Sequence, residues 1–356
     1  MSVCISGRAI AAVAATMTMA ACATTDAPKE ILGVACEAPP PLHCPDANCP
    51  GQLISNLGNA TDPKTGRKFF LDYPCNLKRN DQLTFVLNLH GGGSIGNWQR
   101  HYFPIVDLKE KYKLIVATPS GTGPNGGTGG WNPEKDDQHL RNIVDMVYEQ
   151  FGEKNIKAFW LAGHSLGGQT SNRLINADFY RDRLTGWVSL SGGRLGSRRE
   201  DVRAQIPSAP GAAPAASRPP SPAPAGAAAP LRLVADASVL PSYSFTHIYS
   251  SGEHELTAAG LPANSLWAQK LKCDARVRKA DIVDTKAGYV YDSREQPNPN
   301  KIWGLKPRPG RAEVFVYGNC ENGDLVADII RMDKGHTEGL EPKVTEEIVK
   351  LMMKVK

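Results

Sequence analysis

The stretch of sequence that decides the fold reads Lys157-Ala-Phe-Trp-Leu-Ala-Gly-His-Ser-Leu-Gly-Gly168. Its apolar part, residues 158–162, predicts a buried strand, and the pattern that follows the glycines predicts a helix. Between them, Gly163-His-Ser-Leu-Gly167 fits G-x-S-x-G, a nucleophile elbow whose turn is so tight that side chains two positions either side of the serine would collide. The Ser165 hydroxyl is therefore expected at the carboxyl end of the strand, over a helix amino terminus that favours developing negative charge.

The composition is that of a soluble globular protein. The chain has 356 residues, of which 41% are hydrophobic and 22% charged, enough for one large α/β core or two smaller ones. The net charge of +5 is mild, and no run of Lys and Arg is interleaved with aromatic residues. Nucleic acid is therefore not expected as a partner.

The amino terminus has the pattern of an export signal. Arg8 precedes an apolar, Ala-rich segment, Ile10 to Ala21, that is too short to span a bilayer. It ends in Met19-Ala-Ala-Cys22, which resembles a bacterial lipobox, so residues 1–21 are predicted to be a lipoprotein-type signal peptide and Cys22 the lipidated residue. Ordinary secretion after a similar cut is the alternative. Either way the protein is expected in the cell envelope, as a periplasmic or outer-membrane lipoprotein, or outside the cell. A lipid anchor would be its only contact with a membrane.

Cysteine usage agrees with export. Of the 8 cysteines, Cys4 falls in the signal segment and Cys22 at the lipobox, which leaves six: Cys36, Cys44, Cys49, Cys75, Cys273 and Cys320. An even number in an oxidising compartment predicts disulfides. Zinc is the competing interpretation for the first three. Their spacings include no C-x-x-C pair and no histidine pattern completes a site, so no metal is expected.

Strands and helices are expected to alternate through residues 60–356, after a tether and Cys-rich extension at 22–59. The predicted strands are 67–72, 82–89, 114–117, 158–162, 186–191, 244–249, 313–317 and 326–332, and the main predicted helices are 136–151, 263–271 and 343–353. This alternation predicts an α/β fold with a mostly parallel central sheet covered by helices on both faces. Leu140, Ile143, Val144 and Val147 are expected on the buried side of the first helix.

One segment interrupts this pattern. Residues 207–230 are almost wholly Pro, Ala, Ser and Gly, a composition that buries little apolar surface and disfavours helix and sheet. We interpret it as a solvated insertion loop. An interdomain linker is the alternative, but elements that complete the sheet come only after it.

A serine nucleophile requires a base and an orienting acid, which follow it in the chain order Ser, Asp/Glu, His in sheets of this kind. His336, in Asp333-Lys-Gly-His-Thr-Glu338, comes just after a late strand and is the candidate base. The acid is sought in Ser250-Ser-Gly-Glu-His-Glu-Leu256. Glu255 is favoured there and Glu253 is the alternative, since on a tight turn only one of the two side chains is expected to reach His336.

The transition state also needs donors for the oxyanion. Leu87-Asn-Leu-His-Gly-Gly-Gly-Ser94 follows a buried strand, and its glycines allow the backbone N–H groups a close approach to substrate. Gly92, or else Gly93, is expected to pair with the N–H of Leu166. The candidate substrate contacts are Trp98, Trp131 and His164; simple packing is the competing interpretation for the two tryptophans.

These motifs together resemble the polyhydroxybutyrate depolymerase and feruloyl esterase family. The shared features are the strand before His-Gly-Gly-Gly, then Gly130-Trp-Asn132 and Asp136-Asp137, and finally Val316-Tyr-Gly-Asn-Cys320, a hairpin, a strand and Gly335-His-Thr337. The resemblance implies an α/β-hydrolase fold and a disulfide between Cys273 and Cys320. Two features depart from the family: Glu255 stands where an aspartate is usual, and His-Gly-Gly-Gly replaces the commoner His-Gly-Cys.

The resemblance implies an ester substrate, because members act on polyesters, on feruloylated or acetylated plant polysaccharides and on other esters. The expected activity is therefore that of a serine esterase with no cofactor. A peptidase or amidase on the same triad is a second hypothesis. A surface-binding lipoprotein without catalysis is a third hypothesis. Against it, all the parts that catalysis needs occur in the right order.

The insertion gives a first prediction. If residues 207–230 form a solvated loop, their deletion leaves esterase activity within severalfold of that of the full chain, because no core element is lost. Rates of p-nitrophenyl acetate hydrolysis and circular dichroism of the two proteins test this. Loss of folding on deletion would show that the segment is part of the core.

Overall fold

The computed structural model describes residues 30–36, 59–123, 130–196, 240–291, 304 and 307–355. The predicted signal peptide, Cys22, Cys44, Cys49 and the insertion at 207–230 lie outside these ranges, as does most of the extension at 22–59. Within the described ranges, no helix combines the length and the apolar character that a bilayer span requires.

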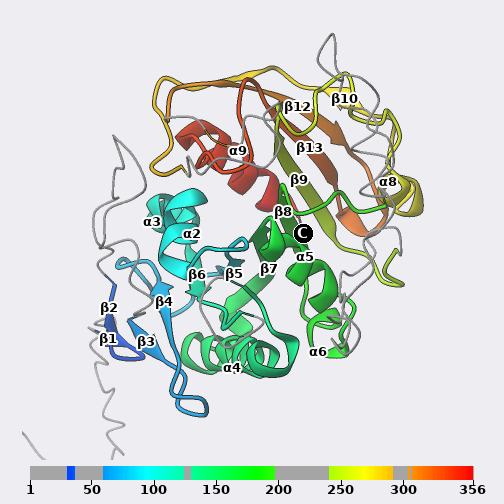
Figure 1. Ribbon diagram of the computed structural model, residues 1–356. Helices are drawn as coiled ribbons and strands as arrows, with labels where there is room; N and C mark the ends of the chain where they lie inside the picture. Colours follow the sequence, from blue (N-terminus) through cyan, green and yellow to red (C-terminus); the bar gives the residue numbers. More distant parts are fainter. Residues whose placement is uncertain are drawn as a thin grey trace, which may run out of the picture.

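The core of the structure is one large sheet (Figure 1). In the described part of the chain it has eleven strands, and β11 (Ile282–Val283) pairs only with β12. The order of the other strands is β10 (Val277–Arg278), β12 (Arg311–Tyr317), β13 (Val326–Arg331), β9 (Thr246–Gly252), β8 (Gly186–Leu190), β7 (Ile156–His164), β5 (Leu83–Leu89), β6 (Leu114–Pro119), β4 (Lys68–Asp72) and β3 (Ala60–Thr61).

The six central strands, from β13 to β6, are parallel, and the strands outside them are antiparallel. The central strands read as nearly continuous apolar runs because both faces are covered. In β5, β6 and β8 every residue is buried. The carboxyl ends of β5, β7, β8, β9 and β13 therefore lie next to one another along one edge of the sheet.

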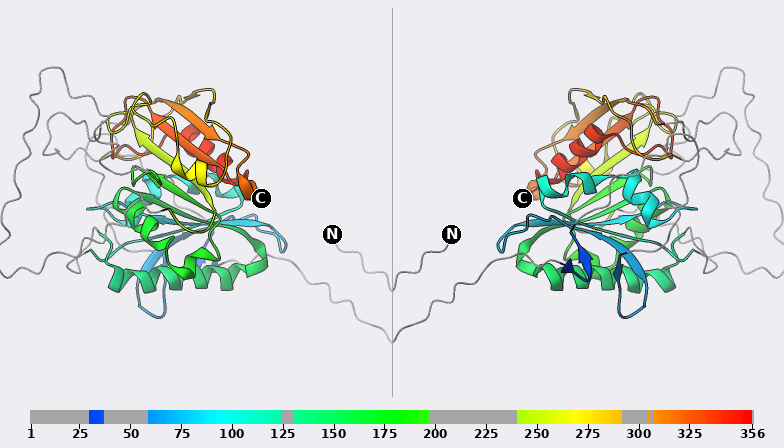
Figure 2. Two further views of the ribbon diagram at one scale, coloured as in Figure 1. Left: turned by 90° about the vertical axis from the view of Figure 1, so that its right-hand side faces the viewer. Right: turned by 90° about the vertical axis from the view of Figure 1, so that its left-hand side faces the viewer.

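Helices cover both faces of this sheet (Figure 2). The described helices are α2 (Gly96–Tyr102), η1 (Ile105–Leu108), α3 (Lys109–Tyr112), α4 (Pro133–Phe151), η2 (Glu153–Asn155), α5 (Leu166–Leu174), α6 (Asp178–Arg181), α8 (Leu266–Lys270), η3 (Glu321–Gly323) and α9 (Pro342–Met352). Apolar side chains of α4, α5, α6 and α8 pack in one core cluster. Those of α2, η1 and α9 pack in a second cluster. A mostly parallel sheet between two helical layers, with a strand–serine–helix turn at its centre, is the α/β-hydrolase fold.

Most predicted elements are present with shifted ends. The predicted buried residues of α4, namely Leu140, Ile143, Val144 and Val147, are all inaccessible to solvent. The predicted helix 263–271 is shorter, because the Ser265 hydroxyl accepts a hydrogen bond from the Ala268 N–H (3.2 Å) and caps α8 there. Strand β8 ends one residue earlier than predicted, at Leu190, and β9 continues to Gly252.

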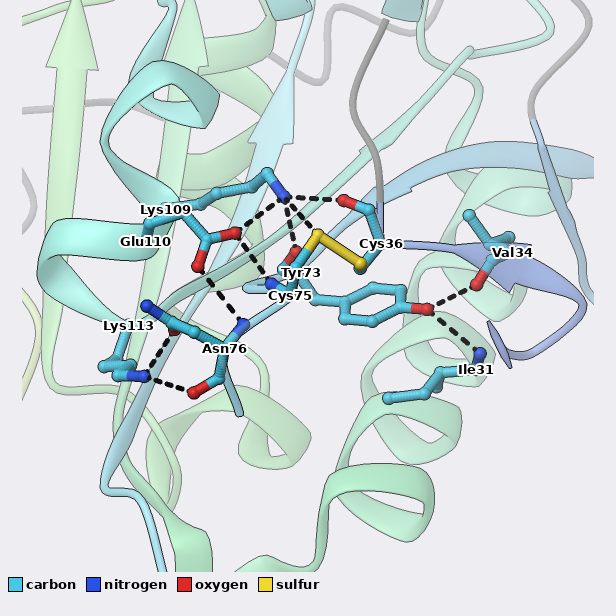
Figure 3. Close-up of a disulfide and its surroundings, with 9 residues drawn as sticks. All are labelled: Ile31, Val34, Cys36, Tyr73, Cys75, Asn76, Lys109, Glu110 and Lys113. Carbon is cyan, nitrogen blue, oxygen red and sulfur yellow. Dashed lines mark hydrogen bonds and ion pairs between the residues drawn. A yellow bond between two sulfur atoms is a disulfide. The ribbon is translucent and has the colours of Figure 1, made fainter. Parts of the chain in front are cut away.

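The amino-terminal extension contains structure that was not predicted. Residues 30–36 form a hairpin of β1 (Glu30–Ile31) and β2 (Val34–Ala35), and a disulfide joins Cys36 to Cys75 (Figure 3). The Tyr73 hydroxyl donates to the Val34 carbonyl and accepts from the Ile31 N–H, so one side chain spans both strands. This hairpin could not be predicted from residue periodicity, because each of its strands is only two residues long.

The same disulfide is surrounded by polar contacts. The buried Lys109 ammonium donates to the carbonyls of Cys36 (2.6 Å) and Tyr73 (2.7 Å), and lies 3.3 Å from a Glu110 carboxylate oxygen (Figure 3). Because Cys36 is bonded to Cys75, it is not available to the zinc site that was considered for the cluster at 36, 44 and 49. A second disulfide joins Cys273 to Cys320, the pair that the family resemblance implies.

A buried carboxylate lies in the turn between β3 and β4. Asp62 follows β3 and accepts hydrogen bonds from His139 Nδ1 (2.9 Å), the Asn142 amide (2.9 Å) and the Thr65 hydroxyl (2.6 Å). Burial alone would raise the pKa of the Asp62 carboxyl, but these bonds and the Lys64 N–H outweigh it and hold the pKa at about 2. The turn between β3 and β4 is thereby attached to α4.

This site predicts how stability depends on pH. Because the folded pKa of Asp62 lies below its unfolded value, its contribution is present above about pH 4 and is lost as the pH falls toward 2. We expect Asp62→Asn to lower the free energy of unfolding by about 2 kcal/mol at pH 7 and to flatten its decline in acid. Urea denaturation from about pH 7 to pH 2.5 measures both effects. Asp182→Asn, at an exposed carboxylate, is the control. If the stability of Asp62→Asn declined in acid as that of the unmodified protein does, the prediction would be contradicted.

Candidate active site

The turn between β7 and α5 has the strained geometry of a nucleophile elbow. Ser165 has φ 49° and ψ −116°, values that few residues other than glycine adopt. A Cβ at Gly163 would lie 2.4 Å from the carbonyl of Gly167, and a Cβ at Gly167 would lie 2.3 Å from the carbonyl oxygen of Leu89. A side chain at either position would therefore collide with the backbone, as predicted. Glycine at the two positions allows α5 to approach the end of β5.

The glycine loop after β5 lies directly against the elbow. A Cβ on Gly91 would be 2.7 Å from Nδ1 of His164, and one on Gly92 would be 3.6 Å from a methyl group of Leu166. Gly92 is exposed, and Gly93 has φ 70° in the left-handed region. The backbone of the two predicted oxyanion donors, Gly92 and Leu166, is thus brought together at the amino end of α5.

Two buried side chains fix this loop. The His90 imidazole accepts a hydrogen bond from the Gly121 N–H (2.9 Å) and donates to the Gly91 carbonyl (2.7 Å), while its own carbonyl accepts from the Trp131 indole (2.8 Å). Burial lowers the pKa of His90 to about 4, so the ring is neutral and one nitrogen can accept while the other donates. Trp131 is only 8% exposed. In this structure Trp131 packs against the glycine loop. It therefore has the packing role that was the competing interpretation for this residue.

The candidate base and the candidate acid meet at the same edge. His336, which follows β13, lies with Nδ1 2.6 Å from Oε1 of Glu255, which follows β9. The ring centroids of His336 and His164 are 4.7 Å apart, and His164 Nε2 donates to the His336 carbonyl (2.9 Å). His336 is therefore seated against the residue that immediately precedes Ser165.

The structure distinguishes the two candidate acids. Glu253 does not face His336; its carboxylate accepts a hydrogen bond from the Asp333 N–H (2.7 Å) at the base of the loop. Burial alone would raise the pKa of the Glu255 carboxyl, but His336 and the hydroxyls of Ser191 and Ser251 hold it below its usual value. Glu255 is thus ionised at neutral pH, as an acid that orients an imidazole must be.

The loop that carries His336 is closed by Arg331, the last residue of β13. Its guanidinium donates to the carbonyls of Glu338 (2.7 Å) and Gly339 (2.8 Å) and to the Glu341 carboxylate (3.0 Å). The Glu341 carboxylate also binds the Lys334 ammonium (3.0 Å), and all three charged side chains are about 2% exposed. A buried charge is tolerated only when it is paired, so this set fixes both ends of the loop.

The wall beside His336 is aromatic. The Trp98 ring stacks on Tyr102 with centroids 4.9 Å apart and lies 5.7 Å from His164. The Tyr102 hydroxyl donates to the His336 carbonyl (3.2 Å), the same oxygen that His164 binds. Burial lowers the pKa of His164 well below its ordinary value, so it is neutral. His164 was predicted as a substrate contact, but it is buried and binds the loop that carries His336. Trp98 is partly exposed at the edge of this wall.

Sequence reasoning gave no role to three of these residues: Tyr102, Ser191 and Ser251. The element that carries Tyr102, α2, was not among the predicted elements. Ser191 was predicted only as the last residue of a strand, and Ser251 only as part of the loop that follows another strand. A signal was present for Ser191, which ends a predicted strand and precedes two glycines. Among the described residues, no group of His, Cys, Asp and Glu side chains is arranged to hold a metal ion.

Comparison with known proteins gives only distant similarities. No family model matches the chain, and no curated protein matches it. Among solved structures, the acetyl xylan esterase from Aspergillus awamori is 16% identical and covers 83% of this chain and 96% of its own, with a TM-score of 0.42. The fluorophosphonate-binding serine hydrolase FphF from Staphylococcus aureus is 19% identical and covers 36% of this chain and 54% of its own, with a TM-score of 0.27. An esterase from Thermogutta terrifontis is 10% identical over 52% of this chain and 66% of its own, with a TM-score of 0.31. At these values the chemistry of the site has to be argued from its own geometry.

The contrast between the two glutamates is testable. Glu255→Gln keeps the shape of the side chain but removes the charge that faces Nδ1 of His336, so we expect kcat for p-nitrophenyl acetate to fall by a factor on the order of 10⁴. Glu253→Gln is the matched control: its amide oxygen still accepts from the Asp333 N–H, and kcat is expected to stay within about twofold. Equal losses in the two variants, at unchanged melting temperatures, would contradict the assignment of the acid.

Proposed function

We propose that this chain is a serine esterase that hydrolyses carboxylic esters through Ser165, His336 and Glu255. Its substrate class is proposed to be that of the polyhydroxybutyrate depolymerase and feruloyl esterase family: feruloyl or acetyl esters of polysaccharides, or hydroxyalkanoate polyesters. The observation that carries the proposal is the 2.6 Å contact between His336 Nδ1 and Glu255 Oε1 on loops that border the strained serine turn.

The chemistry follows from these groups. His336 takes the proton of the Ser165 hydroxyl as its oxygen attacks the ester carbonyl carbon, and the N–H groups of Gly92 and Leu166 stabilise the resulting oxyanion. The bond to the alcohol then breaks, and His336 passes its proton to the leaving oxygen. A water molecule that His336 deprotonates attacks the acyl-enzyme, releasing the acid and restoring the serine. Glu255 keeps the imidazole in the required tautomer and stabilises its charged form.

Two further features support the proposal. The preorganised glycine loop matters because each oxyanion donor contributes about a hundred- to a thousandfold in rate, and the bonds of His90 hold that loop in one conformation. The two disulfides accord with a protein that functions outside the cytoplasm. We therefore propose an envelope or secreted location, with lipid on Cys22 as the only membrane anchor and a soluble or polymeric ester as the only partner.

A substrate panel tests this function. The purified protein is incubated with p-nitrophenyl acetate, a feruloyl ester, a hydroxybutyrate oligomer and a p-nitroanilide, and labelled with a fluorophosphonate probe. We expect hydrolysis of one or more of the esters and labelling of Ser165, with both abolished in Ser165→Ala. Turnover of the anilide alone would change the assignment to an amidase. No turnover of any member, together with an unlabelled serine, would indicate a binding protein.

A further inference from the structure

The two oxygens of the Glu255 carboxylate have different partners. Oε1 faces His336, whereas Oε2 accepts hydrogen bonds from the hydroxyls of Ser191 (2.5 Å) and Ser251 (3.3 Å). A glutamate has one more rotatable bond than the aspartate usual at this position, so its carboxylate needs a second point of attachment to face the imidazole in one orientation. The short bond from Ser191 supplies that attachment.

Of the two serines, Ser191 makes the dominant contact. The Ser251 hydroxyl has a single proton, its distance to Glu255 is long, and the Gly252 carbonyl (3.5 Å) is a second acceptor beside it. The bond from Ser191 is much shorter, as is usual for a hydroxyl that donates to an ionised carboxylate.

The backbone at Ser191 is also unusual. This residue has φ 52°, in the left-handed region that glycine adopts without strain and serine seldom does. Its N–H donates to the Ser250 carbonyl (2.7 Å) of β9, and the next residue, Gly192, would with a Cβ meet the Cα of Gly168 at 2.5 Å. The turn at Ser191 and Gly192 thus lies between α5, which follows Ser165, and β9, which leads to Glu255. A strained backbone is retained in such a place only if its surroundings enforce it.

We propose that Ser191 is a positioning residue for the reaction of this site: its hydroxyl holds the Glu255 carboxylate so that Oε1 faces His336. This inference rests on the proposed esterase function. It assigns to the end of β8 a part in catalysis that acts through the acid and does not touch the substrate. Ser251 makes a smaller contribution of the same kind.

The bond has a consequence for pH dependence. The hydroxyl of Ser191 stabilises the ionised form of Glu255 and so contributes to lowering the pKa of that carboxyl. Removing the hydroxyl raises this pKa, and the carboxylate is then protonated at a higher pH as the solution is acidified. The part of the acid limb of kcat that arises from protonation of this carboxylate therefore moves to higher pH. A serine with a merely structural role would leave the limb in place.

Three variants test the inference: Ser191→Ala, Ser191→Gly and Ser251→Ala. For each, kcat and KM for p-nitrophenyl acetate are measured from about pH 4 to pH 9, with melting temperatures. Both Ser191 variants are expected to lose roughly ten- to a hundredfold in kcat, with KM within about twofold and the acid limb shifted upward. Ser251→Ala is expected to lose less than about fivefold.

The Ser191→Gly variant separates the effect of the hydroxyl from the effect of the strained backbone. It removes the hydroxyl while relieving the left-handed strain, so it remains informative even if the alanine variant folds poorly. Wild-type kcat and an unmoved acid limb in Ser191→Gly would overturn the inference and leave the esterase function intact. An unmodified protein that turns over no ester would instead overturn the proposed function and the inference with it.

Discussion

The site depends on how closely α5 approaches the end of β5. With no side chain at Gly167, the helix backbone lies against the carbonyls of Leu89 and His90, which a Cβ would meet at 2.3 and 2.5 Å. This contact sets the separation between the serine turn and the glycine loop, and it leaves both with little freedom to move. The bonds that His90 makes to Gly121 and Gly91 then fix the loop from its other side. Backbone packing thus determines the relative position of the proposed nucleophile and the proposed oxyanion donors, before any side chain contributes.

The proposed acid and the proposed base are held by a different means, since both lie on loops. The two loops bind each other: the His254 N–H donates to the Lys334 carbonyl (3.0 Å), and a Cβ on Gly252 would lie 2.3 Å from that same oxygen. Arg331 closes the base loop with bonds to two of its carbonyls. Buried ion pairs seldom add much net stability, because desolvation offsets the attraction between the charges. Their value here lies in geometry, since the loop has one arrangement in which every buried charge is paired.

The parts of this site that sequence could predict are those with short-range causes. The elbow, the glycine loop and the long helix α4 have fixed spacings between glycines or apolar residues, and spacing is visible in a sequence. Other features depend on contacts between distant segments. Trp131 is buried because the His90 carbonyl lies beside its indole, and Ser191 meets Glu255 from 64 residues away. The short hairpin at 30–35 has too few residues to show a period, and the choice between Glu253 and Glu255 required the position of the Asp333 N–H.

The covalent link at the amino terminus also determines how mechanical tension would enter the molecule. A pull on residue 30 passes through the hairpin to the bond between Cys36 and Cys75 and reaches the domain beside β4. In the sheet, β6 separates β4 from β5, so tension applied there first loads the antiparallel side of the sheet. The strands that end at the serine, the glutamate and the histidine lie farther along the sheet. A chain held by its amino end would therefore be held at the antiparallel side of its sheet, with two parallel strands, β6 and β5, between the attachment and the strand that ends at the serine.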